Sequence, residues 1–390
     1  MKIFNKENRA LFGLSLGHFS VDLYASLLVP LYPFIVSKLD INLATISSTI
    51  ALGHLVSSMM QPIFGFVADK LKHRFFMVWG LILSSIFIPF SIKANSLLFF
   101  TMCLLLGMVG NAFFHPQVSA LIKEFNKNNP KITFIMGVFL GIGTLGYAIG
   151  PYVSSFTVNH FGQNALLFLS AIGLFSAVFM CFFVPKKPKT QLQNQDNFFF
   201  IIKEILKNKC CMFLTFVSII KSAVSISFGT YIPFLLKSHG FSLPTIGLIV
   251  TGYFVMGGFA TIYSSKFENK IGSKGVITLS FVTILPLILL FLYFINTNKI
   301  IAISAFILTG FFIMLSVGIL LVQGQNAMPK YTGVISGVMQ GFSWGIGALF
   351  LSPLGFLGQQ FGIDKILILM SSLALLTGIY SYKSKYLKQM

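Results

Sequence analysis

The chain has 390 residues, of which 55% are hydrophobic and only 9% are charged, whereas soluble globular proteins are about one quarter charged. Together with a mean hydropathy of +0.85, this composition excludes a soluble enzyme. The net charge of +19 comes from lysines that occur in small groups between apolar runs. No basic stripe is interleaved with aromatic residues, so the charge indicates membrane topology and no nucleic-acid partner.

Apolar runs long enough to cross a bilayer follow one another along the whole chain. A spanning helix needs about 20 apolar residues, so twelve of them would use roughly 240 positions and leave short connections. We therefore predict an all-α membrane protein with twelve transmembrane helices. The predicted spans lie at about 11–36, 43–67, 75–93, 97–122, 132–158, 163–184, 211–236, 243–265, 275–295, 300–323, 332–357 and 364–382.

The positive charges alternate between the two sides of these spans. Of the 28 Lys and Arg residues, 22 fall in the termini and loops of one side and five in the loops of the other, while Lys221 lies inside a span. Because basic residues accumulate on the cytoplasmic side, we predict that both termini are cytoplasmic. An odd number of spans would break this alternation.

The longest polar stretch separates two sets of six predicted spans. Residues 185–209 contain two prolines and six lysines, which is typical of a linker. We predict an N-terminal six-helix bundle over 1–184, a cytoplasmic linker over 185–209 and a C-terminal six-helix bundle over 210–390.

The two sets of spans share motifs at one offset of 200 residues. Because each copy has six spans, both copies have the same orientation, which predicts a parallel pseudo-two-fold repeat about an axis along the membrane normal. Such a repeat is typical of alternating access, in which two bundles rock around a shared site. The recurring segments are Tyr32-Pro33-Phe34-Ile35 with Ile232-Pro233-Phe234-Leu235, Leu43-Ala44-Thr45-Ile46 with Leu243-Pro244-Thr245-Ile246, Asp69-Lys70-Leu71-Lys72 with Asn269-Lys270-Ile271-Gly272, and Gly137 and Gly141 with Gly337 and Gly341.

Two charged residues lie deep inside predicted spans, where a charge is costly and marks function. Asp22 is about 16 Å from the start of its span and Lys221 about 15 Å from the start of its own, at 1.5 Å per residue. Their positions differ by 199, so they are nearly equivalent in the two halves. We predict proton coupling at Asp22 and binding of an anionic substrate at Lys221. A structural salt bridge and misplaced span boundaries are the alternatives.

A charged loop follows the second predicted span. Gly65-Phe66-Val67-Ala68-Asp69-Lys70-Leu71-Lys72-His73-Arg74 resembles the signature loop of the major facilitator superfamily, although Lys72 replaces a glycine and His73 a cation. A carboxylate near basic residues and a helix end can latch a gate in one state. The resemblance implies a cytoplasmic gate made by Gly65, Asp69, Lys70 and Arg74. A solvated topology loop is the alternative.

The fifth predicted span is rich in glycine. Its pattern resembles that of the drug/proton antiporters of the superfamily, except that Ser154 and Ser155 stand where the family has glycines. Small residues allow close helix approach and proline adds a bend, so packing at the bundle interface is nearly as good an interpretation as coupling. The residues assigned to helix packing and the bend are Gly137, Gly146, Gly150 and Pro151.

The same span also contains a literal dinucleotide-binding string. The pattern is Gly141-x-Gly143-x-x-Gly146. It follows no predicted strand and lies within an apolar helix, so it does not indicate a nucleotide site. We predict that the protein has no cofactor.

Four further motifs resemble the fosmidomycin-resistance branch of the superfamily. This resemblance covers most of the chain and implies a drug exporter of the bacterial inner membrane. The motifs are Gly17-His18-Phe19-Ser20-Val21-Asp22, Phe113-Phe114-His115-Pro116-Gln117, Gln323-Gly324-Gln325-Asn326-Ala327-Met328-Pro329 and the series Gly333, Gly337 and Gly341.

Histidine, amide and aromatic side chains complete the predicted site. His18 lies four residues before Asp22 and shares its helix face, and His115 belongs to a matching motif, so we assign both to proton coupling. His54, in the middle of its span, is interpreted as a packing residue. No metal-ligand spacing is present, which predicts no metal site. The residues assigned to a substrate cavity, some of which packing would also explain, are Lys221, Asn111, Gln117, Tyr147, Gln323, Gln340 and Trp344.

Together these features predict a monomeric secondary transporter in the bacterial cytoplasmic membrane. It would export a small organic compound in exchange for protons. The alternative of the same kind is a proton-coupled uptake symporter for a sugar or organic acid. A membrane-embedded enzyme would need a clustered catalytic set, which the sequence lacks, and a receptor would have no need for a six-plus-six repeat.

Overall fold

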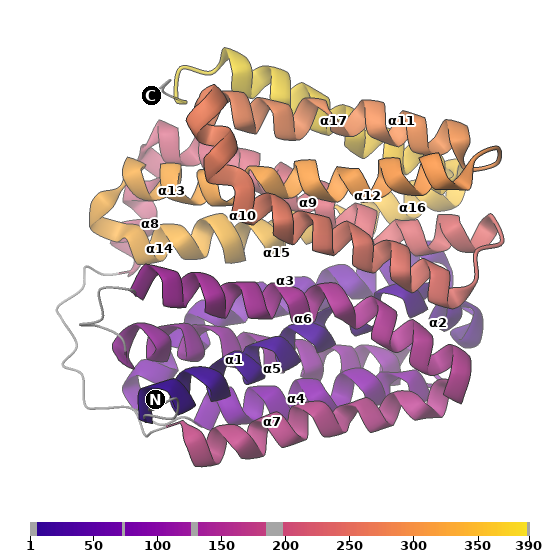
Figure 1. The fold of residues 1–390 in the computed structure, drawn as a ribbon, viewed down its shortest axis with the longest axis horizontal. Coiled ribbons are helices and arrows are strands. Elements are labelled where there is room, and N and C mark those ends of the chain that lie inside the picture. Colours follow the sequence, from indigo (N-terminus) through magenta and orange to yellow (C-terminus); the bar gives the residue numbers. More distant parts are fainter. Residues whose placement is uncertain (1–5, 72–74, 126–131, 185–197, 388–390) are drawn as a thin grey trace, which may run out of the picture. The chain divides into compact units, whose positions relative to one another are not determined.

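A computed structural model of the chain describes residues 6–71, 75–125, 132–184 and 198–387. Every regular element in these ranges is a helix, and together they form an all-α fold (Figure 1). Within some helices the side chains are also outside the described set, among them those of residues 65–71.

The helices of the first half follow the predicted apolar runs. They are α1 (Lys6–Leu27), η1 (Val29–Leu31), α2 (Tyr32–Leu39), α3 (Leu43–Leu71), α4 (Phe75–Phe90), η2 (Ser91–Lys93), α5 (Leu97–Phe125), α6 (Ile132–Phe161), η3 (Gln163–Leu169) and α7 (Ser170–Phe183).

The second half is helical in the same way but is divided into shorter elements. They are α8 (Phe198–Lys207), α9 (Lys209–Ser238), α10 (Leu243–Val282), α11 (Ile284–Phe294), α12 (Lys299–Leu315), α13 (Val317–Ala327), η4 (Pro329–Tyr331), α14 (Thr332–Ser336), η5 (Gly337–Phe342), α15 (Ser343–Leu349), α16 (Leu351–Phe361) and α17 (Ile363–Lys383).

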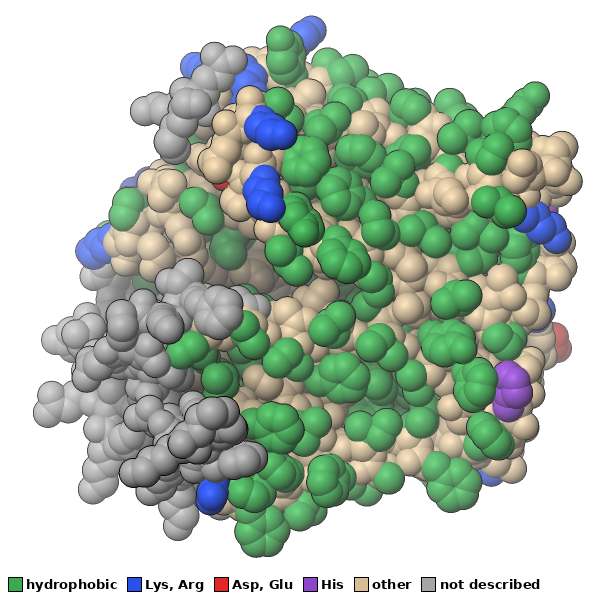
Figure 2. Space-filling model, viewed as in Figure 1, with side chains coloured by type: hydrophobic (Ala, Val, Ile, Leu, Met, Phe, Trp, Pro, Cys, Tyr) green, Lys and Arg blue, Asp and Glu red, His purple; other side chains and the backbone are tan. Residues whose placement is uncertain are grey.

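Ten segments of the described chain are long and apolar enough to cross a membrane. One of them, Leu243–Phe294, has 52 residues and contains Gly272 with φ 68°. Two of the predicted spans fall in this one segment, on either side of that break. Hydrophobic side chains are spread over much of the face shown in Figure 2. Among the exposed large ones, Phe168 and Phe182 are each 80% exposed. A multi-pass membrane protein explains this exposure, because lipid rather than water meets those side chains.

The helices form two compact units whose boundaries differ from a simple division at the linker. The first unit contains residues 1–41, 56–190 and 241–251, and the second contains 42–55, 191–240 and 252–390. Thus the first turns of α3 belong with the second unit, and the first turns of α10 belong with the first.

Two glycines explain this exchange of helix ends. A Cβ atom at Gly247 of α10 would lie 2.7 Å from the backbone oxygen of Pro151 in α6. A Cβ atom at Gly355 of α16 would lie 2.5 Å from Ser47 of α3. Because only glycine fits at these contacts, each helix start packs closely within its unit.

Turns recur at the offset of 200 seen in the sequence motifs. Asp40 has φ 50° and Gly240 has φ 75°, and Gly162 has φ 80° and Gly362 has φ 95°. Helices α3 and α10 begin at Leu43 and Leu243 directly after the first of these pairs. The left-handed residues therefore end corresponding helices in the two halves.

The predicted polar linker contains an amphipathic helix. Over Phe198–Lys207 (α8), Ile201 and Ile205 are buried, whereas Lys203 and Lys207 share the helix with them. The prediction missed this helix because a count of lysines over 185–209 conceals apolar residues spaced four apart, which is the spacing of one helix face.

Candidate functional site

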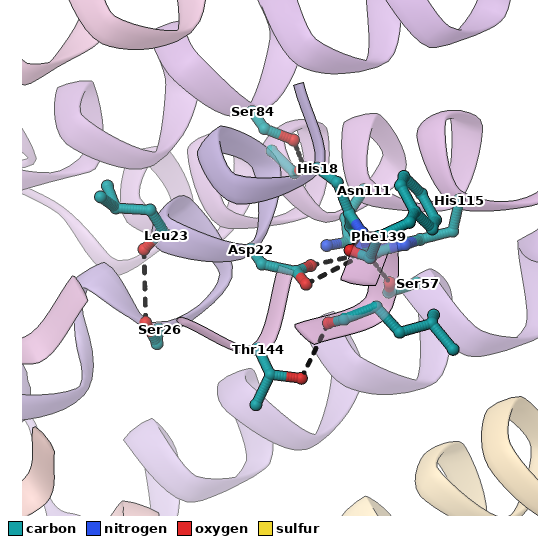
Figure 3. Close-up of polar contacts among 12 residues, drawn as sticks. His18, Asp22, Leu23, Ser26, Ser57, Ser84, Asn111, His115, Phe139 and Thr144 are labelled. Atoms are coloured by element: carbon teal, nitrogen blue, oxygen red, sulfur yellow. Dashed lines mark hydrogen bonds and ion pairs between the residues drawn. The ribbon is translucent and has the colours of Figure 1, made fainter. Parts of the chain in front are cut away.

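A cluster of three titratable side chains lies inside the first unit. His18 and Asp22 project from α1 and His115 projects from α5 (Figure 3). The Nε2 atom of His18 is 3.2 Å from Asp22 Oδ2, and the Nε2 atom of His115 is 3.2 Å from Asp22 Oδ1. The side chains of His18 and Asp22 are only 5% and 15% exposed. The carboxylate thus has one imidazole on each oxygen.

The other nitrogen of His18 determines which protons this cluster contains. His18 Nδ1 lies 3.0 Å from the backbone oxygen of Phe139 in α6. A carbonyl oxygen only accepts, so Nδ1 carries a hydrogen and donates it. The contact between His18 Nε2 and Asp22 Oδ2 then requires one further proton, on either the imidazole or the carboxyl group, because two lone pairs would otherwise face each other. The described geometry is therefore that of a site holding a proton.

Glycines of α6 let this helix approach the cluster. A Cβ atom at Gly143 would lie 2.6 Å from Asp22 Oδ2 and would also meet the ring of His18. A Cβ atom at Gly146 would meet the backbone oxygen of Phe19, and one at Gly150 would lie 2.6 Å from the backbone oxygen of Leu23. The glycines of the rejected dinucleotide string thus include one that makes room for the candidate site.

The predicted packing residues of α6 fit this picture where the structure describes them. Gly146 and Gly150 are buried against α1, and Pro151 lies inside the continuous helix. Ser26 of α1 donates to the backbone oxygen of Tyr147 over 2.6 Å, which adds a polar tie between the same helices. The environment of Gly137 lies outside the described set.

A second cluster lies in the other unit. Lys221 of α9 is 6% exposed, and its Nζ atom is 5.6 Å from the centre of the Trp344 ring in α15. The indole nitrogen of Trp344 donates to Nδ1 of His54 over 3.4 Å. His54 belongs to the part of α3 that packs with this unit. The predicted packing histidine is therefore a polar partner of a predicted substrate residue.

The remaining predicted cavity residues of the first unit make local hydrogen bonds. Asn111 Oδ1 accepts from Ser57 Oγ over 3.0 Å. Gln117 is buried, and its Oε1 atom accepts from the backbone N–H of Met77 over 2.7 Å. Gln117 thus ties α5 to α4, which is a structural role.

The two remaining glutamines of the second unit lie in different settings. Gln323 donates to Ser273 Oγ over 2.9 Å, and Ser273 in turn donates to Glu268. Gln340 is exposed within the π-helical turn η5. The structure thus assigns Gln323 to a network at Glu268, an acidic residue that the sequence analysis did not single out.

The predicted cytoplasmic gate falls largely outside the described chain. Arg74 is not described, and neither are the side chains of Gly65, Asp69 and Lys70, although α3 continues to Leu71.

Among the described residues, His18, Asp22 and His115 also form a group whose ligand atoms could hold a metal ion. One donor atom from each residue lies within 4.8 Å of the others. Each imidazole, however, faces its own carboxylate oxygen, which is the arrangement of two separate hydrogen bonds. That pairing favours a bound proton as the occupant.

Comparison with known proteins gives one family. The model of the Major Facilitator Superfamily matches residues 14–352. The fosmidomycin resistance protein of Escherichia coli (strain K12) is 23% identical over 93% of this chain and 89% of its own length. The quinolone resistance protein NorA of Staphylococcus aureus (strain COL) is 22% identical over 90% of this chain and 88% of its own length.

Solved structures agree on the fold. A mutant form of the nucleoside transporter NupG superimposes with a TM-score of 0.81, at 16% identity, over 97% of this chain and 99% of that one. With a family match across most of the sequence and transporter folds among its structural neighbours, the chain belongs to the Major Facilitator Superfamily of transporters.

Proposed function

We propose that this transporter exports a small organic compound in exchange for protons, by alternating access of two six-helix halves in the bacterial cytoplasmic membrane. The observation that carries the proposal is the His18, Asp22 and His115 cluster, in which one contact needs a proton to exist. An ionisable group inside a membrane span marks a proton or ion pathway.

Loss of that proton changes the contacts of three helices. With Nδ1 of His18 held by the Phe139 carbonyl, deprotonation leaves the Nε2 lone pair facing a carboxylate oxygen. The His18–Asp22 contact then becomes repulsive, so Asp22 and its contact with His115 of α5 must shift relative to the His18 ring that α6 holds. A conformational change follows from a difference in free energy between two states, and this proton supplies such a difference.

Supporting features come from the sequence and the relatives. Proteins named for resistance to fosmidomycin and to quinolones align over most of the chain, which supports outward transport of a small organic compound. The excess of basic residues on one predicted side supports cytoplasmic termini. We further propose that Asp69 and its basic neighbours latch the cytoplasmic gate and that Lys221, Trp344 and Gln340 contact the cargo.

Proteoliposomes with a trapped pH-sensitive dye test the coupling. Fosmidomycin and a quinolone, the compound classes named for the relatives, are the first candidate cargos. We expect one of them to drive proton movement in the opposite direction in the wild-type protein. The Asp22→Asn variant, of nearly the same size, should bind this cargo but lower coupled proton flux by about 100-fold.

Two outcomes would contradict the proposal. Proton flux in Asp22→Asn vesicles equal to the wild-type flux would remove the cluster from coupling. Loss of transport on addition of a metal chelator would instead indicate a bound metal ion. Counterflow in everted vesicles decides the direction, since an uptake symporter would move protons and cargo the same way.

A further inference from the structure

We propose that Lys221, His54 and Trp344 form a binding site for the negatively charged group of a small organic anion, carrying one carboxylate or phosphonate. The proposal rests on the transport function above and specifies the class of cargo. All three residues belong to the second unit. His54 is new to the site, because its sequence position alone marked it as a packing residue.

The first step is that no described side chain of this unit neutralises Lys221. No hydrogen bond or ion pair to its Nζ atom is present among the described residues, and its described contact is the face of Trp344. The acidic residues that the structure describes in this unit have other partners. Glu204 pairs with Lys207 at 2.8 Å, Glu268 accepts from Ser273, and Asp364 pairs with Lys365 at 3.1 Å. A buried cation without a counter-ion is costly, and a bound anion would offset that cost.

The second step is that His54 offers another donor. The indole N–H of Trp344 can only donate, so Nδ1 of His54 accepts. A neutral imidazole that accepts at Nδ1 carries its hydrogen on Nε2. Nε2 of His54 has no acceptor among the described residues. The cluster therefore contains an ammonium group and an N–H group that both lack an acceptor.

The third step is that the arrangement is held by the backbone. Gly347 lies three residues after Trp344, on the same face of α15, and a Cβ atom there would be 2.7 Å from the backbone nitrogen of Ala223 in α9. The close approach of these helices keeps the Trp344 ring beside Lys221. The π-helical turn η5 (Gly337–Phe342) directly precedes α15, and such turns often occur at functional sites.

These groups select one charge and one kind of molecule. Donors without acceptors favour an anion and disfavour a cation. The indole ring and the apolar helix faces around Lys221, which include Val217 and Val224, favour a ligand with an apolar body over a small inorganic ion.

Fluorescence of Trp344 provides a direct binding measurement. The chain has two tryptophans, and Trp79, in the first unit, is 45% exposed. The Trp79→Phe protein in lipid nanodiscs therefore reports on Trp344 alone. The probes are benzoate, phenylphosphonate, benzamide and sodium nitrate, all titrated without a pH gradient. Benzamide has the ring of benzoate but no charge, and nitrate has the charge but no apolar body.

We expect saturable changes with benzoate or phenylphosphonate at concentrations at least 10-fold lower than with benzamide or nitrate. In this background Lys221→Met should weaken benzoate binding at least 10-fold and leave the response to benzamide unchanged. Lys266→Met is the matched control, since Lys266 also lies over an aromatic ring, 4.8 Å from the centre of Tyr263, but is exposed. This control should bind benzoate as well as the parent protein does.

Several results would overturn the proposal. They are equal responses to benzoate and benzamide, competition by nitrate at the concentration of benzoate, and unchanged benzoate binding in a folded Lys221→Met protein. If Lys221→Met does not fold, the comparison of the four probes on the parent protein still decides. Because binding is measured at equilibrium, failure here with intact Asp22-dependent proton flux would leave the proposed transport function standing.

Discussion

The two polar clusters show opposite ways of placing charge inside a helical bundle. In the first unit Asp22 has an imidazole on each carboxylate oxygen, so its partners are supplied by the protein. In the second unit Lys221 has an aromatic face as its described contact and no counter-ion among the described residues. The first cluster (His18, Asp22 and His115), here called the compensated cluster, pairs its charges within the protein and can hold a proton. The second (Lys221, Trp344 and His54), here called the uncompensated cluster, leaves the Lys221 charge available to bind an anionic ligand. This difference is consistent with the two proposals above, coupling at the cluster of the first unit and cargo recognition at the cluster of the second.

Apart from Asp22→Asn, the largest effect should come from a methyl group placed against the compensated cluster. Gly143→Ala puts a Cβ atom 2.6 Å from Asp22 Oδ2, and the carboxylate must move away from its imidazole partners. We expect coupled proton flux to fall by about 10- to 100-fold, since a small misplacement of a functional group has effects of that size. Coupled proton flux measured in proteoliposomes tests this prediction.

Gly141→Ala is the matched control, because no atom of the described residues lies within 4 Å of a Cβ added there. Both changes replace glycine by alanine in the same helix, so a general effect on helix propensity is common to both. Equal flux in the two variants would show that the space at Gly143 is not needed.

The two histidines of the compensated cluster should differ in importance. His18 contacts both Asp22 and the Phe139 carbonyl, whereas the described ion pair of His115 is with Asp22 and its side chain is 25% exposed. We expect His18→Asn to lower coupled flux by about 10-fold and His115→Asn by about 3-fold. The reverse order, measured in the same vesicles, would contradict the assignment of the central proton to the His18–Asp22 contact.

A smaller effect is expected at the uncompensated cluster from loss of the indole N–H. Trp344→Phe keeps an aromatic face beside Lys221 but removes the donor to His54. Benzoate affinity, measured by calorimetry because the fluorescent reporter is lost, should fall by about 3-fold, as expected for one neutral hydrogen bond. A loss as large as that of Lys221→Met would show that the indole N–H contributes as much to binding as the ammonium group does, which contradicts the assignment of Lys221 as the main anion ligand.

The smallest effect on binding should come from the gate. Asp69→Asn should slow transport by about 3-fold and leave cargo affinity unchanged, since a latch biases one conformation without touching the ligand. The equivalent position of the second half holds Asn269, and its replacement by alanine should matter less. A changed affinity in Asp69→Asn would contradict the latch.

The sequence predicted an all-helical chain and named all three residues of the compensated cluster as candidates. Apolar run lengths place the helices because a bilayer span has a required length. His18 and Asp22 could be paired from their spacing of four residues, which places them on one helix face. His115 was found only through a motif, since its contact with Asp22 joins α1 to α5.

The missed features all depend on contacts between distant parts of the chain. His54 and Trp344 are 290 residues apart, and no local pattern connects them. Gly143 was set aside with the dinucleotide string, because its purpose is visible only when α1 lies against it. The exchange of the first turns of α3 and α10 between the units depends in the same way on the glycines of partner helices.

The central claim, that the His18–Asp22 contact holds one titrating proton, can be tested directly by nitrogen NMR of the protein labelled at its 6 histidines, with His18→Asn to assign the signal. We predict that Nδ1 of His18 carries a hydrogen throughout the titration and that a single proton is lost from the Nε2–Asp22 contact as the pH rises. In Asp22→Asn this shared proton should be absent. The claim would be contradicted if Nδ1 of His18 carried no hydrogen, or if the His18 signal did not respond to the loss of the Asp22 charge.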